Sequence, residues 1–332
     1  MRKMFSEILL SIKDGIYIVL SLIALAIGFI YGADLISGTP LSLKATMEAS
    51  NIVKPPLIAF FPIYFFSEDV YIPLPYPVSL NQLVYILLVV YIIFYAISIA
   101  RDLDIYTALR RGKYWDNSLI ATIALSAFTA VIIVVIDMIQ SKAGVSSGNL
   151  QVPNEYIRFV SAFIAPLIEE FGFRLTLIGV AAFIIYYLIV SRENSRINIK
   201  GIVMVFWQPY EVIVRKYNNK GMIKLLYAIG VIVAIYFGLK HYLAGSGWGV
   251  GKITTASIAG IILAYLYIRY GFHSAVLSHG YFNIFLLSLY YLARYLSSSY
   301  TYLAQLVYFL TFTLGGLVAI YYVLVLISRF LR

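Results

Sequence analysis

Long apolar runs recur along the whole chain, and they constrain its fold more than any other feature. A run of about 18 or more residues with few charges predicts a membrane-spanning helix, because about 20 apolar residues are needed to cross the hydrocarbon core. Eight runs approach or meet this description, at residues 16–31, 83–100, 119–139, 158–190, 225–244, 254–268, 274–291 and 303–327. The sequence therefore predicts an all-α, polytopic integral membrane protein with about eight transmembrane helices.

The composition supports this class. Hydrophobic residues make up 62% of the chain and charged residues 12%, whereas a soluble domain has about 25% charged residues. The absence of cysteine excludes disulfides, thiolate nucleophiles, iron–sulfur clusters and Cys-type zinc sites. The net charge of +10 does not predict nucleic acid binding, because the basic residues lie in loops between the apolar runs, where they set the topology. The expected surroundings are a lipid bilayer.

The basic residues also orient the spans. With the N-terminus inside, 17 Lys and Arg lie on the inner side and six on the outer side. This asymmetry predicts that both termini are cytoplasmic, in a multi-pass protein of the plasma membrane. No small-residue cleavage site follows residues 1–14, so we predict a retained first helix rather than a signal peptide.

The chain is predicted to form a single membrane domain over residues 1–332. Its catalytic core helices are expected within 158–291, and a basic cytoplasmic loop is expected at 191–221, where residues 201–207 predict an interfacial helix. The connection 32–78 contains seven of the ten prolines. An apolar patch inside it, residues 57–66, is too short to span and predicts a re-entrant or interfacial piece.

Beyond its first residue, Arg158, the fourth apolar run contains three charged residues, each of which costs about 2.5–3.5 kcal/mol to insert. Glu170 and Arg174 are four residues apart, share a helix face and predict a neutralised structural pair. Glu169 points about 100° away from Glu170. Its own face carries mostly small residues, so the carboxylate has room beside it and is suited to act as a general base.

Two later runs carry histidines. Phe237 and His241 share one face of the fifth run, and His279 and Asn283 share one face of the seventh. Each group alone is typical of structural hydrogen bonding between helices. Converging neutral donors such as His279 and Asn283 would also suit an oxyanion hole. His273, at the inner boundary of the seventh run, is interpreted as an interface residue.

The order Glu169-Glu170-x-x-x-Arg174, Phe237-x-x-x-His241 and His279-x-x-x-Asn283 resembles the CPBP family, the CAAX prenyl endopeptidase and bacteriocin-processing group of glutamic intramembrane endopeptidases. Each motif alone is weak, but the three in order on separate predicted membrane helices are specific. They extend over about 115 residues. The resemblance also implies an eight-helix fold.

The resemblance implies cleavage of peptide bonds within the membrane. By motif position, Glu169 and His241 would activate the attacking water, and His279 and Asn283 would stabilise the oxyanion. Glu170, Arg174 and Phe237 would support the site. Family substrates are membrane-anchored or prenylated CAAX-type proteins, and no cofactor is implied.

A zinc site formed by Glu169, His241 and His279 is the alternative to a metal-free site. We favour the metal-free site because Asn283 joins His279 on one face, because the histidines lack obvious partner carboxylates, and because the resemblance implies a glutamic mechanism.

Two further functions and one further catalytic mechanism stay open. A non-proteolytic membrane scaffold or immunity protein of the same family would keep the fold without cleavage, but the intact motifs argue against it. A proton- or cation-coupled transporter would use the glutamate pair as its ion site, but it predicts inverted repeats, which the sequence does not show. A serine hydrolase using Ser246 is a remote alternative.

Overall fold

The computed structural model describes residues 2–66 and 68–330. Within this part of the chain, eight helical stretches are long and apolar enough to cross a membrane: Ser11–Ala49, Leu80–Ala100, Ser118–Lys142, Glu155–Arg192, Lys220–Leu243, Gly251–Tyr270, Phe272–Tyr295 and Ser298–Arg329. The predicted count of eight spans and the all-α polytopic class are confirmed.

Several spans consist of more than one element, because π-helical segments interrupt the α-helices. In chain order the elements are α1 (Arg2–Ala33), η1 (Asp34–Gly38), α2 (Thr39–Ala49), β1 (Leu57–Phe65), β2 (Glu68–Ser79), α3 (Leu80–Ala100), α4 (Ile105–Arg111), η2 (Tyr114–Asp116), α5 (Ser118–Lys142), α6 (Glu155–Glu170), η3 (Phe171–Ile178), α7 (Gly179–Arg192), α8 (Ile199–Trp207), η4 (Glu211–Lys216), α9 (Lys220–Leu243), α10 (Gly251–Tyr270), α11 (Phe272–Gly280), η5 (Tyr281–Phe285), α12 (Leu286–Tyr295) and α13 (Ser298–Phe330).

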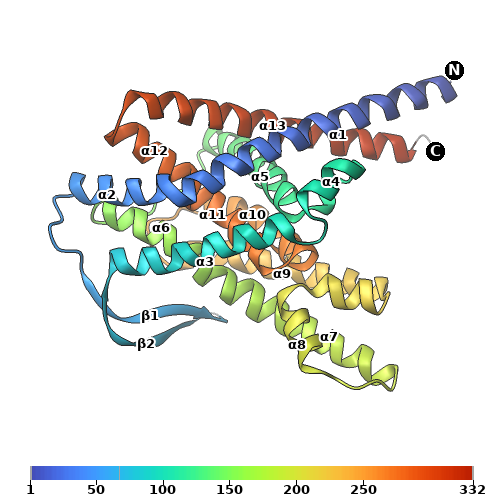
Figure 1. The fold of residues 1–332 in the computed structure, drawn as a ribbon, viewed down its shortest axis with the longest axis horizontal. Helices are drawn as coiled ribbons and strands as arrows, with labels where there is room; N and C mark the ends of the chain where they lie inside the picture. The colour runs from blue at the N-terminus through green and yellow to red at the C-terminus, as the bar shows by residue number, and fades with distance from the viewer. Residues whose placement is uncertain (1, 67, 331–332) are drawn as a thin grey trace.

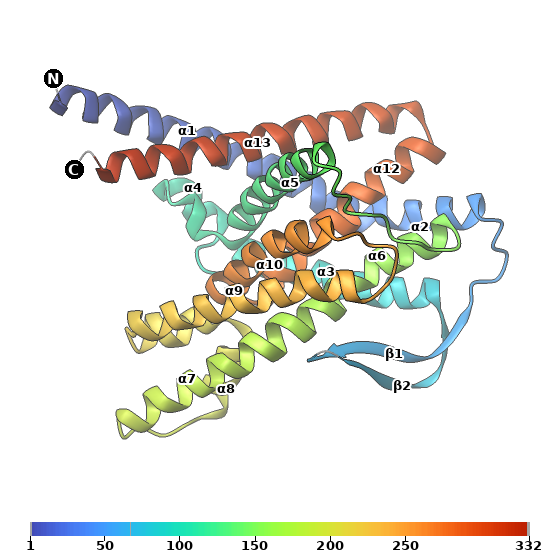
Figure 2. The ribbon, with the colours of Figure 1, turned by 180° about the vertical axis from the view of Figure 1, so that it is seen from behind.

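The helices form an elongated bundle. The long helices α1 and α13 lie side by side along one side, while the hairpin β1–β2 and helices α7 and α8 lie on the other (Figures 1 and 2). Between them, α11 is the central helix, and all nine of its residues are buried. Helix α1 begins and helix α13 ends at the same end of the bundle (Figure 1).

The apolar patch 57–66, predicted to be a re-entrant or interfacial piece, forms strand β1 over residues 57–65, which pairs antiparallel with β2. Strand β2 carries proline at alternate positions, which prevents a helix, and β1 is rich in aromatic residues that favour strands. The backbone of β1 approaches η3 so closely that a Cβ added at Gly172 would lie 2.7 Å from the carbonyl oxygen of Tyr64. Glycine at this position therefore allows the hairpin to rest against the helix that carries the glutamates.

Helices α9 and α10 also approach each other closely, as membrane helices do where small residues face each other. A Cβ added at Gly260 would lie 3.0 Å from the Cβ of Ala234. The same stretch of α10 accepts a hydrogen bond from the glutamate-bearing helix, because Arg174 Nη2 donates to the carbonyl of Gly260 at 3.3 Å. Gly260 thus allows the close packing of α9 against α10 and also accepts the hydrogen bond from Arg174.

Candidate active site

The predicted site residues lie on three neighbouring helical stretches. Glu169 and Glu170 end α6, Arg174 lies in η3, Phe237 and His241 lie toward the end of α9, and His279 and Asn283 lie in α11 and η5. Counted along the chain, the two histidines lie nearer opposite sides of the membrane. The structure nevertheless brings them together, because α9 ends beside the α6–α7 helix (Figure 2), within reach of Glu169.

One cavity of about 530 Å³ joins these residues. It is lined by Glu169, His241, His279 and Asn283, while small side chains on one face of α10, including Ala256 and Ala259, leave it open. Glu170 and Arg174 lie behind its wall and have no exposed side-chain surface. The two adjacent glutamates therefore meet different surroundings, as the helix periodicity predicted.

The Glu169 carboxylate faces both histidines. Its Oε2 lies 3.9 Å from His241 Nε2 and 3.7 Å from His279 Nε2. Both distances exceed a hydrogen bond. Oε2 is buried and has no hydrogen-bond partner among the described residues. The carboxylate thus lies beside two imidazole nitrogens but forms no direct hydrogen bond with either.

The tautomer of His241 follows from its own helix. Its Nδ1 lies 2.9 Å from the carbonyl oxygen of Phe237, one turn earlier. A carbonyl oxygen only accepts hydrogen bonds, so Nδ1 carries the proton and the neutral ring presents an unprotonated Nε2 to Glu169. This nitrogen can accept a proton inside the cavity.

His279 makes contacts at both ring nitrogens. Nδ1 lies 2.9 Å from Glu170 Oε1, and the Asn283 amide nitrogen lies 3.3 Å from Nε2. If the Asn283 amide donates to Nε2, the neutral ring carries its proton on Nδ1 and donates it to Glu170. The sequence did not predict the contact with Glu170. His279 therefore does have a partner carboxylate, so the absence of one is not an argument against zinc binding at this histidine.

Phe237 packs at the centre of this group. The Arg174 guanidinium lies 4.4 Å from its ring centroid, and its ring meets those of His241 and His279 edge-on at 4.6 and 6.2 Å. Arg174 Nε lies 3.1 Å from Glu170 Oε2, so the sequence-predicted pair is present. The aromatic ring thereby fixes the positions of the cation and both histidines.

Two features of the site have no signal in the motifs. The π-helical segments η3 and η5 begin directly after Glu170 and Gly280, and such segments are frequent at functional sites. The hairpin supplies Tyr64, which lines the cavity and stacks on Phe173 at 5.5 Å. Burial raises the pKa of the Tyr64 phenol, an effect that Lys240 opposes by hydrogen bonding.

Within residues 2–66 and 68–330, no group of three His, Asp or Glu side chains has the arrangement of metal ligands.

His273 is not the interface residue that the sequence suggested. It is fully buried, its ring stacks on that of Trp207 at 5.6 Å, and its Nε2 lies 3.4 Å from Ser118 Oγ. The predicted helix over 201–207 is present as α8, and its last residue provides this stacking partner. The turn at Gly271, with φ of 113°, directs His273 into the bundle instead of toward the boundary.

Comparison with protein-family models gives a match over residues 154–285 to type II CAAX prenyl endopeptidase Rce1-like. The matched stretch begins at the residue that caps α6, since Asn154 Oδ1 accepts from Ile157 N at 2.9 Å, and it ends in η5. It therefore contains every predicted site residue. No curated protein and no solved structure gives a match. The match supports the predicted CPBP family assignment, and the matched family implies a protease, which is a hydrolase.

Proposed function

We propose, from the premise that this chain belongs to the CPBP family and carries its Rce1-like domain, that it is a glutamic intramembrane endopeptidase. Its substrates are membrane-anchored peptides, including prenylated CAAX-type proteins. One observation carries the proposal: the Glu169 carboxylate lies 3.7–3.9 Å from two imidazole nitrogens in a cavity large enough for a peptide segment. Cavities of about 300–1,000 Å³ are typical of small-molecule sites.

Glu169 and His241 activate the water in this mechanism. Two atoms 3.9 Å apart can both hydrogen-bond to one oxygen that lies beside the line joining them. Both Glu169 Oε2 and His241 Nε2 are acceptors, so both hold the water through its protons. As the water oxygen attacks the peptide carbonyl carbon, one proton passes to this pair.

His279 and Asn283 face the developing oxyanion. The Asn283 amide donates directly. His279 donates from Nε2 only when both ring nitrogens are protonated, since Nδ1 already faces Glu170. When the tetrahedral intermediate collapses, the proton taken from water reaches the leaving nitrogen, the C–N bond breaks, and a carboxylic acid and an amine result.

The supporting residues hold this arrangement in place. Glu170 compensates the buried charge of Arg174 and fixes the orientation of His279. Phe237 supports His241 through both ring contact and its carbonyl oxygen. These contacts support the proposed roles because a site built on locked side chains loses little entropy on reaching the transition state.

The site requires no metal in this proposal, and no cofactor takes part. Elemental analysis of active protein tests this directly. Stoichiometric zinc, together with activity that is lost to a chelator and restored by zinc, would contradict it.

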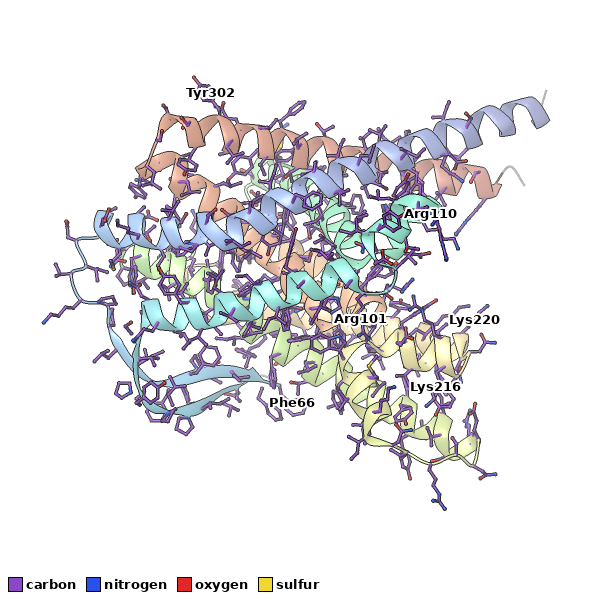
Figure 3. All side chains as sticks on the ribbon, in the orientation of Figure 1. Phe66, Arg101, Arg110, Lys216, Lys220 and Tyr302 are labelled. Carbon is purple, nitrogen blue, oxygen red and sulfur yellow. The ribbon has the colours of Figure 1, made fainter. Side chains whose placement is uncertain are left out.

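We also propose that residues 1–332 act as one membrane domain, with the core helices 158–291, a cytoplasmic basic loop 191–221 and both termini in the cytoplasm, at the plasma membrane. Arg110, Lys216 and Lys220 lie at the end of the bundle where the chain begins and ends (Figure 3), which supports this orientation. The loops that line the cavity lie at the other end (Figure 2). The site then opens toward the outer side.

The chain contains no cysteine, so single-cysteine labelling tests the orientation cleanly. In intact cells, a membrane-impermeant thiol reagent should label Ser147→Cys and leave Lys220→Cys unlabelled until the cells are opened. The reverse pattern would contradict the orientation and leave the catalytic proposal standing.

Incubation of purified protein with prenylated and unprenylated membrane-anchored peptides, read by mass spectrometry, tests the activity. Glu169→Gln should abolish cleavage without lowering the melting temperature, while Glu48→Gln, which changes an exposed glutamate, should cleave normally. Full activity in a folded Glu169→Gln variant would remove the catalytic assignment, and no cleavage by the native protein would favour the scaffold alternative.

A further inference from the structure

A second cavity, of about 470 Å³, lies where α3 ends, directly after the span Leu80–Ala100. It is lined by Ile97, Ala100, Arg101, Asp102, Gln208, Glu211 and Arg215, and we call it the α3 pocket. None of these residues lines the cavity of Glu169. Arg101 lies toward the same end of the bundle as Arg110, Lys216 and Lys220 (Figure 3). The α3 pocket is therefore at a membrane boundary, and the proposed peptidase activity gives it no role.

The carboxylates of the α3 pocket are already paired with arginines. Arg215 Nη2 lies 3.0 Å from Asp102 Oδ1, and its Nη1 donates to Glu211 Oε2 at 2.7 Å. Arg269 adds a second cation, since its Nη1 lies 3.5 Å from Asp102 Oδ1 and its Nη2 3.8 Å from Asp116 Oδ1. The Asp102 side chain is only 1% exposed. The negative charges beside the pocket are therefore compensated before any ligand binds.

Arg101 is the cation of the pocket that has no carboxylate partner. Its Nε donates to Gln208 Oε1 at 3.0 Å, and its Nη2 lies 3.8 Å from Met204 Sδ, a weak acceptor. Among the described residues, no carboxylate lies within 4 Å of this guanidinium. Gln208 is itself buried and fixed, because its Nε2 donates to Asp102 Oδ1 and to the carbonyl of Arg269, each at 3.0 Å. One edge of the guanidinium is thus held in place, and its terminal nitrogens are left for an anionic ligand.

The chain around the α3 pocket is basic, since residues 191–224 contain seven Lys and Arg but only two Glu. An excess of one sign of charge raises the local concentration of the opposite ion. Basic pockets between membrane helices bind the anionic headgroups of lipids. A guanidinium with two terminal nitrogens also matches the spacing of two phosphate oxygens. The chemistry of the pocket therefore favours a phosphate group as its ligand.

An apolar surface on α3 leads from the pocket along the membrane. Ile86, Val89 and Ile93 are 51–56% exposed and share one helix face. The same face continues to Ile97 and Ala100, which line the pocket, and we call these five residues the α3 stripe. From Val89 to Ala100 the helix rises about 16 Å, which is about half of the hydrocarbon thickness. A phospholipid with its headgroup in the pocket would therefore lay its acyl chains along this stripe, within one leaflet.

We propose that the α3 pocket is a binding site for an anionic phospholipid, in which the Arg101 guanidinium contacts the phosphate and the α3 stripe contacts the acyl chains. A soluble anion would satisfy Arg101 but leave the stripe uncovered, whereas a phospholipid satisfies both. The bound phosphate joins the end of α3 to the segment that carries Gln208, so the lipid stabilises the packing of these two parts. The inference does not depend on the peptidase activity, because it uses none of the residues of that site.

Two measurements on the full-length protein in detergent test the proposal. Native mass spectrometry gives the affinity for the first molecule of phosphatidylglycerol or phosphatidylcholine bound. Thermal melts compare the effects of phosphatidylglycerol and of inorganic phosphate. Both use the native protein, Arg101→Gln, Ala100→Trp and the control Arg110→Gln, which changes an exposed arginine at the same end of the bundle but outside the pocket. Ala100 is exposed as well, so Ala100→Trp narrows the pocket without disturbing the core and keeps the test decisive if Arg101→Gln does not fold.

Loss of a charged hydrogen bond lowers affinity by about 10- to 100-fold. Arg101→Gln should therefore weaken the binding of phosphatidylglycerol by about that factor, and Ala100→Trp should weaken it too. Arg110→Gln should change it by less than about twofold, because an exposed charge is screened. The native protein should bind phosphatidylglycerol more tightly than phosphatidylcholine. Phosphatidylglycerol should raise the melting temperature of the native protein but not of Arg101→Gln, and inorganic phosphate should not reproduce the rise.

Unchanged binding of phosphatidylglycerol in Arg101→Gln and in Ala100→Trp would overturn the proposal. So would an equal loss in Arg101→Gln and Arg110→Gln, because the lipid would then respond to the general basic charge at this end of the bundle and not to the pocket. If inorganic phosphate raised the melting temperature as much as phosphatidylglycerol does, and only while Arg101 is present, the pocket would belong to a soluble anion, which would also contradict the proposal.

Discussion

The buried pair of Glu170 and Arg174 allows a quantitative test of how this site is held together. Neither side chain has any exposed surface, and their charged atoms lie 3.1 Å apart. Removing one partner of a buried pair costs about 3–5 kcal/mol, because the other charge is left uncompensated. The double replacement removes both charges, and should cost less than either single change.

The structure predicts an order among the variants. Glu170→Gln leaves an arginine that stays charged, whereas Arg174→Met leaves a carboxyl group that can take up a proton. Glu170→Gln should therefore be the most destabilising, Arg174→Met intermediate and the double variant the least. Arg174→Met and the double variant both lose the contact between Arg174 and the Phe237 ring. This loss therefore does not contribute to the difference between their stabilities.

Melting temperatures in one detergent at one heating rate provide the measurement. At about 2 °C per kcal/mol for a chain of this size, the single variants should melt about 6–10 °C below the native protein. Lys44 and Glu48 form the matched control, with the same four-residue spacing but side chains 70% and 63% exposed. Their double-mutant cycle should show almost no coupling.

Additivity of the two single changes within about 0.5 kcal/mol would refute this reasoning. A double variant less stable than Arg174→Met would refute it as well. Either result would mean that packing of the guanidinium, and not charge compensation, accounts for the stability of this part of the bundle.

Other predictions follow from neighbouring contacts. His279→Ala and Asn283→Ala should lower kcat far more than they raise KM, by about 100- to 1,000-fold for each donor, and an effect on KM alone would show that they bind substrate instead. Activity should fall on acidification once His241 is protonated, because it then no longer accepts a proton from water, and a pH–rate profile that stays flat below pH 6 would contradict this. Asp34→Asn should melt near the native protein, whereas Asp34→Leu should lose about 1–3 kcal/mol, since the Ser288 hydroxyl donates to Asp34 at 2.8 Å and would be left without its acceptor. Equal melting temperatures for the two Asp34 variants would show that this bond contributes little.

Local spacing predicted much of this site. Glu170 and Arg174 are one helical turn apart, as are His279 and Asn283, so their proximity follows from the helix repeat alone. The eight spans follow from hydropathy in the same way, because each is a property of a contiguous segment. Such features depend on few assumptions about tertiary structure.

The remaining features depend on distant segments. The sequence placed Glu169, His241 and His279 at different depths, and only the packing of α9 against the α6–α7 helix brings them together. Asp34 was overlooked because it follows the first apolar run and resembled the start of a loop. In the structure it lies in η1 and accepts a hydrogen bond from Ser288, 254 residues away.

The two adjacent glutamates show how the fold assigns different tasks to identical side chains. Glu170 points into the protein, where Arg174 compensates its charge and His279 Nδ1 contacts its other carboxylate oxygen. Glu169 points into the cavity. Among the described residues, no Lys or Arg lies within 4 Å of its carboxylate, and its neighbours there are the two histidines. Glu169 therefore faces the space where water and substrate can enter, while Glu170 is tied to the charge of Arg174. A single helical step of about 100° creates this difference, and it explains why the proposed chemistry requires both residues in this order.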